Sequence, residues 1–421
     1  MRFYGDTNIH FGHGAYDLLA PEPLPDAAKR EVQRVLETGS LFRYLPEQDT
    51  VSNLENEFAH FIGVPFAVAC NSGGCGLFLA LKALGISADE KVLVNAWTLS
   101  PVPGAIVHAN AQPVFVKSDP ETLTIDLEDL ERCARETSAR CLLLSYMRGH
   151  VPDMDKVMAI VKRHELLLIE DCAHTLGAQW STSQRWQHLG SFGDIAVWSL
   201  QTNKSINAGE GGMIATRRQD LASYLIIATG SYGHFEKHQR GGDAEVTRKL
   251  YPNVPNCSMR MSALTAAVAR PQLAQLDRKL DSWQKHYLLL SECFASSNLV
   301  EAVPLTEKHA QENLRSCSSS LQLRLKTFTF TMMERLVAQL CHAGIPVSWY
   351  AGPPQGFVST VRDWHFAGPE ASSHWAMSAS EVLTSIIDLP LYHTTTWQAP
   401  VMEALAGRML AIIEAIASRG P

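Results

Sequence analysis

The stretch SLQTNKSINAGEGG, residues 199–212, places a single lysine between a strand-like run and a glycine turn. The run DIAVWSL at residues 194–200 leads into Lys204, and the turn GEGG closes the stretch at residues 209–212. Glycines let a backbone fold tightly where other residues cannot. A lone lysine after a strand is most often a solvated loop residue. A solvated lysine, however, needs neither the strand-like run before it nor the glycine turn after it. The stretch therefore suggests a lysine held in place for chemistry.

Short apolar runs recur on both sides of this stretch and alternate with helical patterns. Several runs are apolar on consecutive residues, as strands covered by helices on both faces are. The expected strands are residues 66–70, 91–97, 112–117, 140–147, 166–171, 194–200 and 212–216, and the expected helices between them are residues 75–85, 127–136 and 153–165. Asp153 is the expected N-cap of the last helix. This alternation predicts an α/β fold with a mainly parallel sheet, whose sites lie at the carboxyl ends of the strands.

The pattern changes after a polar, glycine-rich run at residues 230–245, which predicts a long loop. The following segments are a helical stretch at 261–294, which Pro271 should end or kink, a run at 320–325, a helix at 330–344, a run at 345–350 and a final helix at 399–418. The run HTTTW at 393–397 predicts a threonine cap before the final helix. We expect a large domain over residues 1–265 and a smaller C-terminal α+β domain over residues 266–421.

Bulk composition excludes several classes of protein. The chain has 421 residues, of which 46% are hydrophobic and 19% charged, and its net charge of -7 argues against a general nucleic-acid binder. No apolar run is long enough to span a membrane. The nine cysteines form no CxxC pair, so we expect no zinc or other metal site. Their odd count, with no signal peptide in view, predicts a cytoplasmic protein.

Three features fit one cofactor, pyridoxal 5'-phosphate. This cofactor needs an amine for its aldehyde carbon, a carboxylate for its ring nitrogen and a cradle for its phosphate. Lys204 supplies the amine, and Asp171 ends the expected strand at 166–171 as the second acid of the pair Glu170-Asp171. Burying that pair is costly unless a cation meets it. Ser199 is placed to reach the phosphate, and the cradle would be the backbone N–H groups of Ser72, Gly73, Gly74 and Cys75 at a helix start.

The order of these features resembles that of the DegT-like, StrS-type sugar aminotransferases, a group within the fold type I pyridoxal-phosphate enzymes. The matching stretches are CNSGGCGLFLAL at 70–81, AQPVFVKSDPETLTID at 111–126, GHVPDMDKVMAIVKRHELLLIEDCAHTLGA at 149–178, GSFGDIAVWSLQTNKSINAGEGGMIAT at 190–216 and CSMRMSALTAAV at 257–268. The resemblance is clear over about residues 25–275 and looser beyond.

The resemblance implies a role for each matching residue. Lys204 matches the lysine that binds the cofactor, Asp171 the partner of the ring nitrogen, and His174 stands near the phenolic oxygen where the family often has glutamine. The implied phosphate partners are Gly73, Gly74 and Ser199. Arg260 matches an arginine near the dimer interface, since the family usually forms homodimers whose active sites both chains complete. Gln201, in SLQTNK, resembles the residue found in the branch of the family that includes cyclitol aminotransferases and aminohydroxybenzoate synthases.

The chain departs from the family around the ring and the phosphate. The stacking aromatic normally follows a threonine directly, whereas NAWTLSP places Leu99 after Thr98. Trp97 lies two positions before Leu99, so in an extended strand both would point to one face. We expect Trp97 or Leu99 to contact the ring. The family's SGT is SGG here, and the asparagine expected two residues before Arg260 is Ser258.

Other residues allow a functional and a purely structural interpretation. The loop at 230–245 holds His234, Lys237, His238 and Arg240, which either contact a ligand or are simply solvated. The segment at 349–357 either closes over substrate or packs between domains. Candidates for binding a substrate anion are Arg148, Arg260 and Arg362.

The expected activity is transamination, with glutamate or glutamine donating an amino group to a keto group on a sugar, cyclitol or similar polyol. In the family that the chain resembles, such steps supply amino sugars to antibiotics or surface polysaccharides. The departures leave a first alternative, in which the same cofactor serves elimination, decarboxylation or oxidation of a small amino acid derivative. A second alternative is a regulatory protein that binds the cofactor without turnover, which the presence of both Lys204 and Asp171 disfavours.

Overall fold

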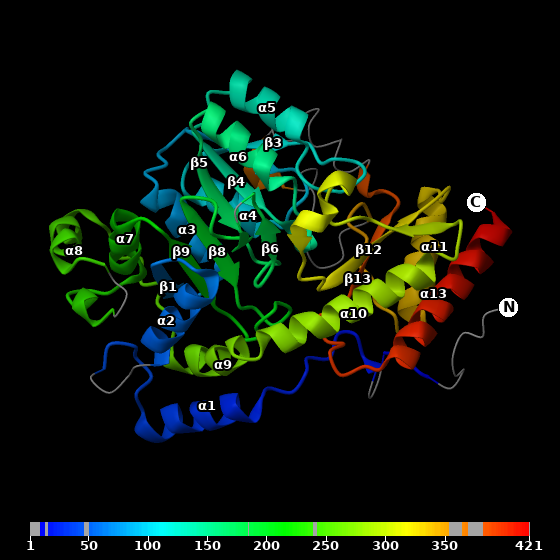
Figure 1. Cartoon of the computed structure of the whole chain (residues 1–421), viewed down its shortest axis with the longest axis horizontal. Coiled ribbons are helices and arrows are strands. Elements are labelled where there is room, and N and C mark those ends of the chain that lie inside the picture. The colour runs from blue at the N-terminus through cyan, green and yellow to red at the C-terminus, as the bar shows by residue number, and fades with distance from the viewer. Residues whose placement is uncertain are drawn as a thin grey trace.

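A computed structural model describes residues 9–12, 16–45, 50–183, 185–238, 242–352, 364–368 and 382–420. Its central feature is a seven-stranded sheet in the order β1-β9-β8-β5-β4-β2-β3 (Figure 1). Its strands are β1 (Phe66–Cys70), β2 (Lys91–Asn95), β3 (Gln112–Val116), β4 (Cys141–Ser145), β5 (Leu167–Asp171), β8 (Ile195–Ser199) and β9 (Gly212–Thr216). Only β9 runs antiparallel to its neighbours, so the predicted α/β fold with a mainly parallel sheet is confirmed.

Helices cover both faces of this sheet, which explains why its strands are apolar on consecutive residues. Leu142 and Leu144 of β4 belong to one buried cluster, while Cys141 and Leu143 belong to the cluster on the other face. The helices of this part are α1 (Asp26–Thr38), α2 (Thr50–Ile62), α3 (Gly73–Ala83), α4 (Pro101–His108), α5 (Leu127–Glu136), α6 (Met154–Arg163), α7 (Gln219–Thr229), α8 (Ala244–Leu250) and α9 (Ala263–Leu273). The helices α1 and α2 were not predicted.

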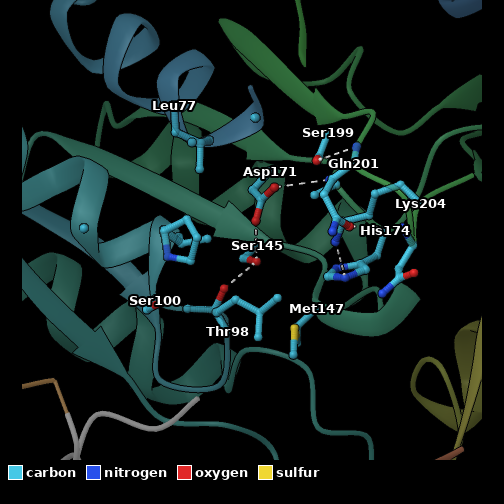
Figure 2. Close-up of a pocket in the computed structure, with 18 of the residues that line it drawn as sticks. Leu77, Thr98, Ser100, Ser145, Met147, Asp171, His174, Ser199, Gln201 and Lys204 are labelled. Atoms are coloured by element: carbon cyan, nitrogen blue, oxygen red, sulfur yellow. Dashed lines mark hydrogen bonds between the residues drawn. The ribbon is translucent and has the colours of Figure 1, made fainter. Parts of the chain in front are cut away.

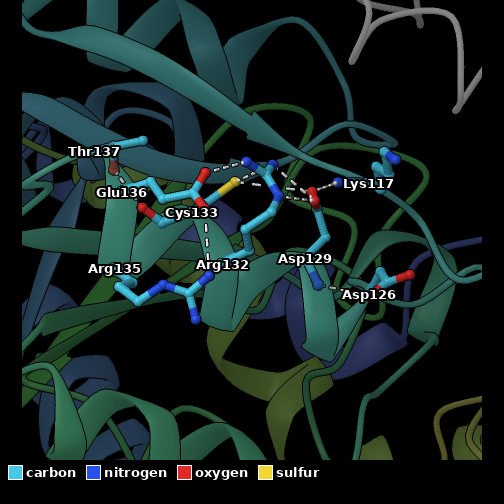
Figure 3. A network of polar contacts seen from close by, with 8 residues as sticks. All are labelled: Lys117, Asp126, Asp129, Arg132, Cys133, Arg135, Glu136 and Thr137. Carbon is cyan, nitrogen blue, oxygen red and sulfur yellow. Dashed lines mark hydrogen bonds and ion pairs between the residues drawn. The ribbon is translucent and has the colours of Figure 1, made fainter.

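Acidic caps fix where the outer helices begin. Asp126 accepts a hydrogen bond from the backbone N–H of Asp129 at 2.9 Å and so caps α5 (Figure 3). The Asp129 carboxylate accepts the backbone N–H of Lys117 at 3.0 Å and pairs with Arg132 at 2.8 Å. This ties α5 to the chain leaving β3. Asp153 accepts two backbone N–H groups at the start of α6, so its predicted role as N-cap is confirmed.

A smaller α+β unit contains the C-terminal helices and an antiparallel sheet in the order β10-β12-β13. Its elements are α10 (Leu276–Phe294), β10 (Val300–Ala302), β12 (Ser320–Leu325), α11 (Phe330–His342), β13 (Ile386–Pro390) and α13 (Ala399–Arg419), and a separate buried cluster joins them. A third sheet comprises β6 (Gln179–Ser181), β7 (Trp186–His188) and β11 (Leu314–Arg315). The predicted boundary between the large and the small domain, at residues 265 and 266, falls inside α9 and stays a prediction.

Several local predictions can be compared with these elements. The helix α9 continues only two residues past Pro271, as expected for a residue that ends a helix. The predicted threonine cap of the last helix is wrong, because Gln398 is the N-cap and caps without its side chain, while Pro400 opens the first turn. In the predicted loop at 230–245, α8 already begins at Ala244. No helix in the described ranges is long and apolar enough to cross a membrane.

Candidate functional site

A cavity of about 1450 Å³ opens at the carboxyl ends of the central strands. This is the edge where parallel α/β sheets place their sites. It brings together most of the residues singled out from the sequence, several of which Figure 2 labels. Those in its wall are Ser72, Gly73, Gly74, Cys75, Leu99, Arg148, Asp171, His174, Ser199 and Lys204.

Lys204 lies on the turn that follows β8, with its amine directed at His174. The Nζ atom is 2.7 Å from Nε2 of His174 (Figure 2). Burial and the nearby positive charge of Arg148 lower the pKa of Lys204 from 10.5 to about 7, although Asp171 opposes this shift. Burial also holds the pKa of His174 well below its usual value, with Lys204 adding to the effect. The site therefore holds a neutral imidazole beside an amine that titrates near neutral pH.

Asp171 ends β5 and points into the same cavity. Its Oδ2 accepts a hydrogen bond from the Ser145 hydroxyl at 2.7 Å, and its Oδ1 accepts the Ala173 backbone N–H at 3.1 Å. Thr98 in turn donates to Ser145 at 2.8 Å (Figure 2). Burial raises the pKa of Asp171, and the Ser145 hydrogen bond and the Ala173 N–H oppose that rise. A buried carboxylate held this way is suited to a cationic partner inside the cavity.

Glu170, the other half of the acidic pair, has a different role. Its carboxylate accepts backbone N–H groups from Gly190, Phe192 and Gly193 at 2.7–2.8 Å, together with the hydroxyl of Tyr146 at 2.7 Å. The expectation that a cation meets this buried acid is therefore wrong for Glu170. Four hydrogen-bond donors stabilise it instead, and it ties the loop before β8 to the sheet.

The predicted phosphate cradle lies at the start of α3. Ser72 caps this helix by accepting the Cys75 backbone N–H at 3.1 Å. A Cβ added to Gly73 would lie 3.0 Å from Cβ of Ser199, so glycine keeps the helix start and the end of β8 in close approach. The positive end of an eleven-residue helix thus faces the cavity beside the Ser199 hydroxyl.

The two candidates for contacting the ring differ in whether they line the cavity. Leu99 lines the cavity, whereas Trp97 is only 1% exposed and packs edge-on against His150 and Tyr350 in a buried cluster. The strand β2 ends at Asn95, so Trp97 lies beyond it, and Leu99 packs against the buried cluster that contains Trp97. That both side chains point to one face stays a prediction. Leu99 is therefore the candidate that lies in the cavity wall, and contact of either side chain with the ring stays a prediction.

Arg260 is not among the residues that line this cavity within one chain. Its guanidinium donates to the carbonyl of Gly230 and to the hydroxyl of Ser258, each at 2.9 Å. The guanidinium also lies over the rings of Phe42 and Tyr232, 5.5 and 5.3 Å from their centroids. Its neighbour Met259 does line the cavity, so the segment passes the site although the arginine points elsewhere.

In the polar loop, none of residues 230–238 and 242–245, the part that the structure describes, lies in the cavity wall. His238 is buried between the ion pair of Arg43 with Glu55 and the hydroxyl of Tyr44, which lies 2.7 Å from its Nε2. Lys237 donates to the backbone carbonyl of Tyr44 at 2.5 Å. Arg240 lies outside the described residues, as do Arg362 and most of the segment at 349–357.

Sequence reasoning missed two side chains of the smaller unit that contact residues of the cavity wall. Asp388 on β13 accepts hydrogen bonds from Tyr350 and Gln322 and pairs with Arg148 at 2.9 Å. His393 lies 3.1 Å from the side chain of Asn203, next to Lys204. No linear pattern joins residues this far apart, so no signal in the sequence could have paired them.

The donor set fits pyridoxal 5'-phosphate. A buried carboxylate, an amine whose pKa is lowered and a helix start closed by Gly73 line one cavity. These are the three groups that the cofactor's ring nitrogen, aldehyde and phosphate require.

Comparison with known proteins agrees with this arrangement. The model of the DegT/DnrJ/EryC1/StrS aminotransferase family matches residues 25–406. The GDP-perosamine synthase of Caulobacter vibrioides is 33% identical over 230 residues, which cover 55% of this chain and 58% of that protein. The L-glutamine:2-deoxy-scyllo-inosose aminotransferase of Streptomyces lividus is 30% identical over 283 residues, or 66% of this chain and 65% of that protein. The chain thus matches less than two thirds of the length of these curated relatives.

Solved structures share the fold over nearly the whole chain. The crystal structure of 3-amino-5-hydroxybenzoic acid synthase superposes with a TM-score of 0.79 at 24% identity, covering 95% of this chain and 98% of that one. Aminotransferases of this family use pyridoxal 5'-phosphate, and one structure of this fold is a PLP-form, so the predicted cofactor and fold type I are confirmed for the family. This chain belongs to the DegT/DnrJ/EryC1/StrS aminotransferase family.

Proposed function

We propose that this chain is an aminotransferase that uses pyridoxal 5'-phosphate. It moves an amino group from glutamate or glutamine to a keto group of a sugar, cyclitol or related polyol, in antibiotic or polysaccharide biosynthesis. The observation that carries the proposal is the amine of Lys204, whose pKa is lowered to about 7, in the same cavity as Asp171. The two curated relatives, one named for a GDP-sugar and one for a glutamine-dependent cyclitol reaction, support the substrate class.

The cofactor, when bound, supplies an aldehyde that takes up amino groups and a ring that withdraws electrons from the reacting carbon. Lys204 would hold the aldehyde until an amino substrate takes its place, and its freed neutral amine would then move the proton on the reacting carbon. His174, 2.7 Å from the amine, fixes where it points. Asp171 would keep the ring nitrogen protonated, and Ser145 holds the Asp171 carboxylate in its orientation.

The remaining predicted site residues bind the ends of the cofactor. The phosphate would lie on the start of α3, which Ser72 caps, against the N–H groups of residues 73–75 and the hydroxyl of Ser199. Leu99 would cover the ring in place of an aromatic side chain.

We further propose that the protein is a cytoplasmic homodimer whose two large domains meet near Arg260. Four large apolar side chains that are 40–48% exposed belong to segments at or near the Arg260 stack, and they are Leu41, Phe42, Leu45 and Tyr232. Large apolar side chains that are exposed near one another are typical of an interface. None of the nine cysteines, all of which lie in the described ranges, forms a disulfide, which fits a reducing compartment. Sedimentation equilibrium tests the dimer, since a monomer at micromolar concentration would contradict it.

A single-turnover experiment tests the activity. The cofactor-loaded protein is mixed with excess glutamate, and separately with glutamine, without an acceptor. A transaminase releases one equivalent of the 2-oxo acid per bound cofactor and then stops. The release of carbon dioxide or ammonia over many turnovers would favour elimination, decarboxylation or oxidation instead. Absence of any product would favour the regulatory alternative.

A further inference from the structure

Arg148 presents an unused half of its guanidinium to the cavity. The residue follows β4 and lies in the left-handed region, with φ of 55°. Its Nε is held by the Tyr350 hydroxyl at 2.8 Å and by Oδ2 of Asp388 at 2.9 Å. The structure gives its two terminal nitrogens no hydrogen-bond partner among the described residues, although the side chain is only 11% exposed and lines the cavity.

We infer that Arg148 binds a carboxylate group of the reacting substrate through these two terminal nitrogens. The inference rests on the proposed function and deepens it, because it gives the substrate a charged group close to the carbon that reacts. Carboxylates are the anions that a planar guanidinium fork matches through two parallel hydrogen bonds.

The geometry selects Arg148 from the three arginines considered for a substrate anion. The guanidinium of Arg260 is used by Gly230 and Ser258 and is not part of the cavity wall. Arg362 lies outside the described residues. Arg148 is close enough to Lys204 and His174 for its charge to disfavour their protonation, so a ligand on Arg148 lies near the reacting amine.

The fixed side of the guanidinium keeps the fork oriented. Asp388 is buried, and it also accepts the amide of Gln322 at 2.6 Å, whose Oε1 lies 2.7 Å from Nε2 of His150. This chain of buried contacts joins the smaller unit to the loop after β4. Because Asp388 already balances part of the arginine's charge, the site suits a singly charged carboxylate better than a doubly charged phosphate.

The carboxylate could belong to the amino donor or to the acceptor, and binding experiments distinguish the two. Calorimetry on the cofactor-loaded protein would use glutarate as the donor-like probe and cyclohexanecarboxylate as the ring-like probe. The neutral amides of both acids are the controls. The double variant Arg148→Gln/Asp388→Asn removes both buried charges together, so that no unpaired charge destabilises the fold.

At least one acid should bind about 10- to 100-fold more weakly to the double variant, while both amides are unaffected. Asp388→Asn alone should tighten binding, because the cation loses its counter-charge. Arg163→Gln, at an exposed arginine on α6, is the matched control and should change nothing. A loss for glutarate assigns the carboxylate to the donor, and a loss for the ring acid assigns it to the acceptor.

Two results would overturn the inference. They are unchanged affinity for both acids in the double variant, and no binding of either acid to the unaltered protein. Because neither readout requires turnover, failure of the proposed aminotransferase activity would show separately in the release of 2-oxo acid.

Discussion

Replacing Lys204 by methionine should stabilise the protein without its cofactor at neutral pH. Folding lowers the pKa of this amine from 10.5 to about 7, so the folded state binds fewer protons than the unfolded state between those values. The unfolding free energy of the unaltered protein must therefore rise with pH across this window. The full shift corresponds to about 5 kcal/mol at neutral pH. Because Lys204 is only partly shielded from solvent, we expect about half of that.

Urea unfolding of the cofactor-free proteins at several values of pH measures the effect. The Lys204→Met variant should exceed the unaltered protein by about 2–3 kcal/mol near pH 7, and the excess should shrink steadily toward pH 10. Methionine keeps the length of the side chain, so packing changes little. Lys162→Met, at an exposed position of α6, is the control and should show no such dependence. A difference that is constant with pH, or a less stable variant at pH 7, would refute the reasoning.

Three further substitutions test the other parts of the site. Ser145→Ala removes the hydrogen bond that opposes the raised pKa of Asp171, so the pKa of Asp171 should rise further. The acid limb of the pH–rate profile should then move to higher pH. An unmoved limb would count against the role of this hydrogen bond. Gly73→Ala should weaken cofactor binding at least tenfold in equilibrium dialysis, because its Cβ would crowd the end of β8, whereas Gly233→Ala, with open space around it, should bind normally. Glu170→Gln leaves buried N–H groups short of acceptors and should lower the unfolding free energy by about 2–4 kcal/mol in urea, and a loss below 1 kcal/mol would disagree with its structural role.

The sheet and its flanking helices could be predicted because they depend on local pattern. Each strand of the large sheet is a short apolar run, and burial on both faces makes that run continuous. Asp153 illustrates the same point for a helix start, where the side chain that caps is adjacent to the turn it caps. The reversed direction of β9 was not predicted, because a run of apolar residues carries no sign of its direction.

Site residues could be predicted only where the position of a residue at or after a strand was enough to identify it. Asp171 ends β5 and Lys204 lies on the turn after the neighbouring strand β8, so the strand order brings both to the same end of the sheet. Whether Trp97 or Leu99 lies in the cavity wall could not be predicted, because β2 ends at Asn95 and the alternation of a strand does not extend to either residue. The role of Asp388 could not be predicted, because its ion pair with Arg148 joins two elements that are far apart in the sequence. The strand that carries Asp388 is also a short run that ends in proline, so it was not recognised.

The most direct test of the account is to locate the cofactor on the chain. The protein loaded with pyridoxal 5'-phosphate is reduced with borohydride, digested and sequenced by mass spectrometry. We expect the reduced cofactor on the peptide that contains Lys204, with no label in a Lys204→Ala variant. Label on a different lysine, or none on a protein that retains the cofactor, would contradict the central claim that this amine holds it.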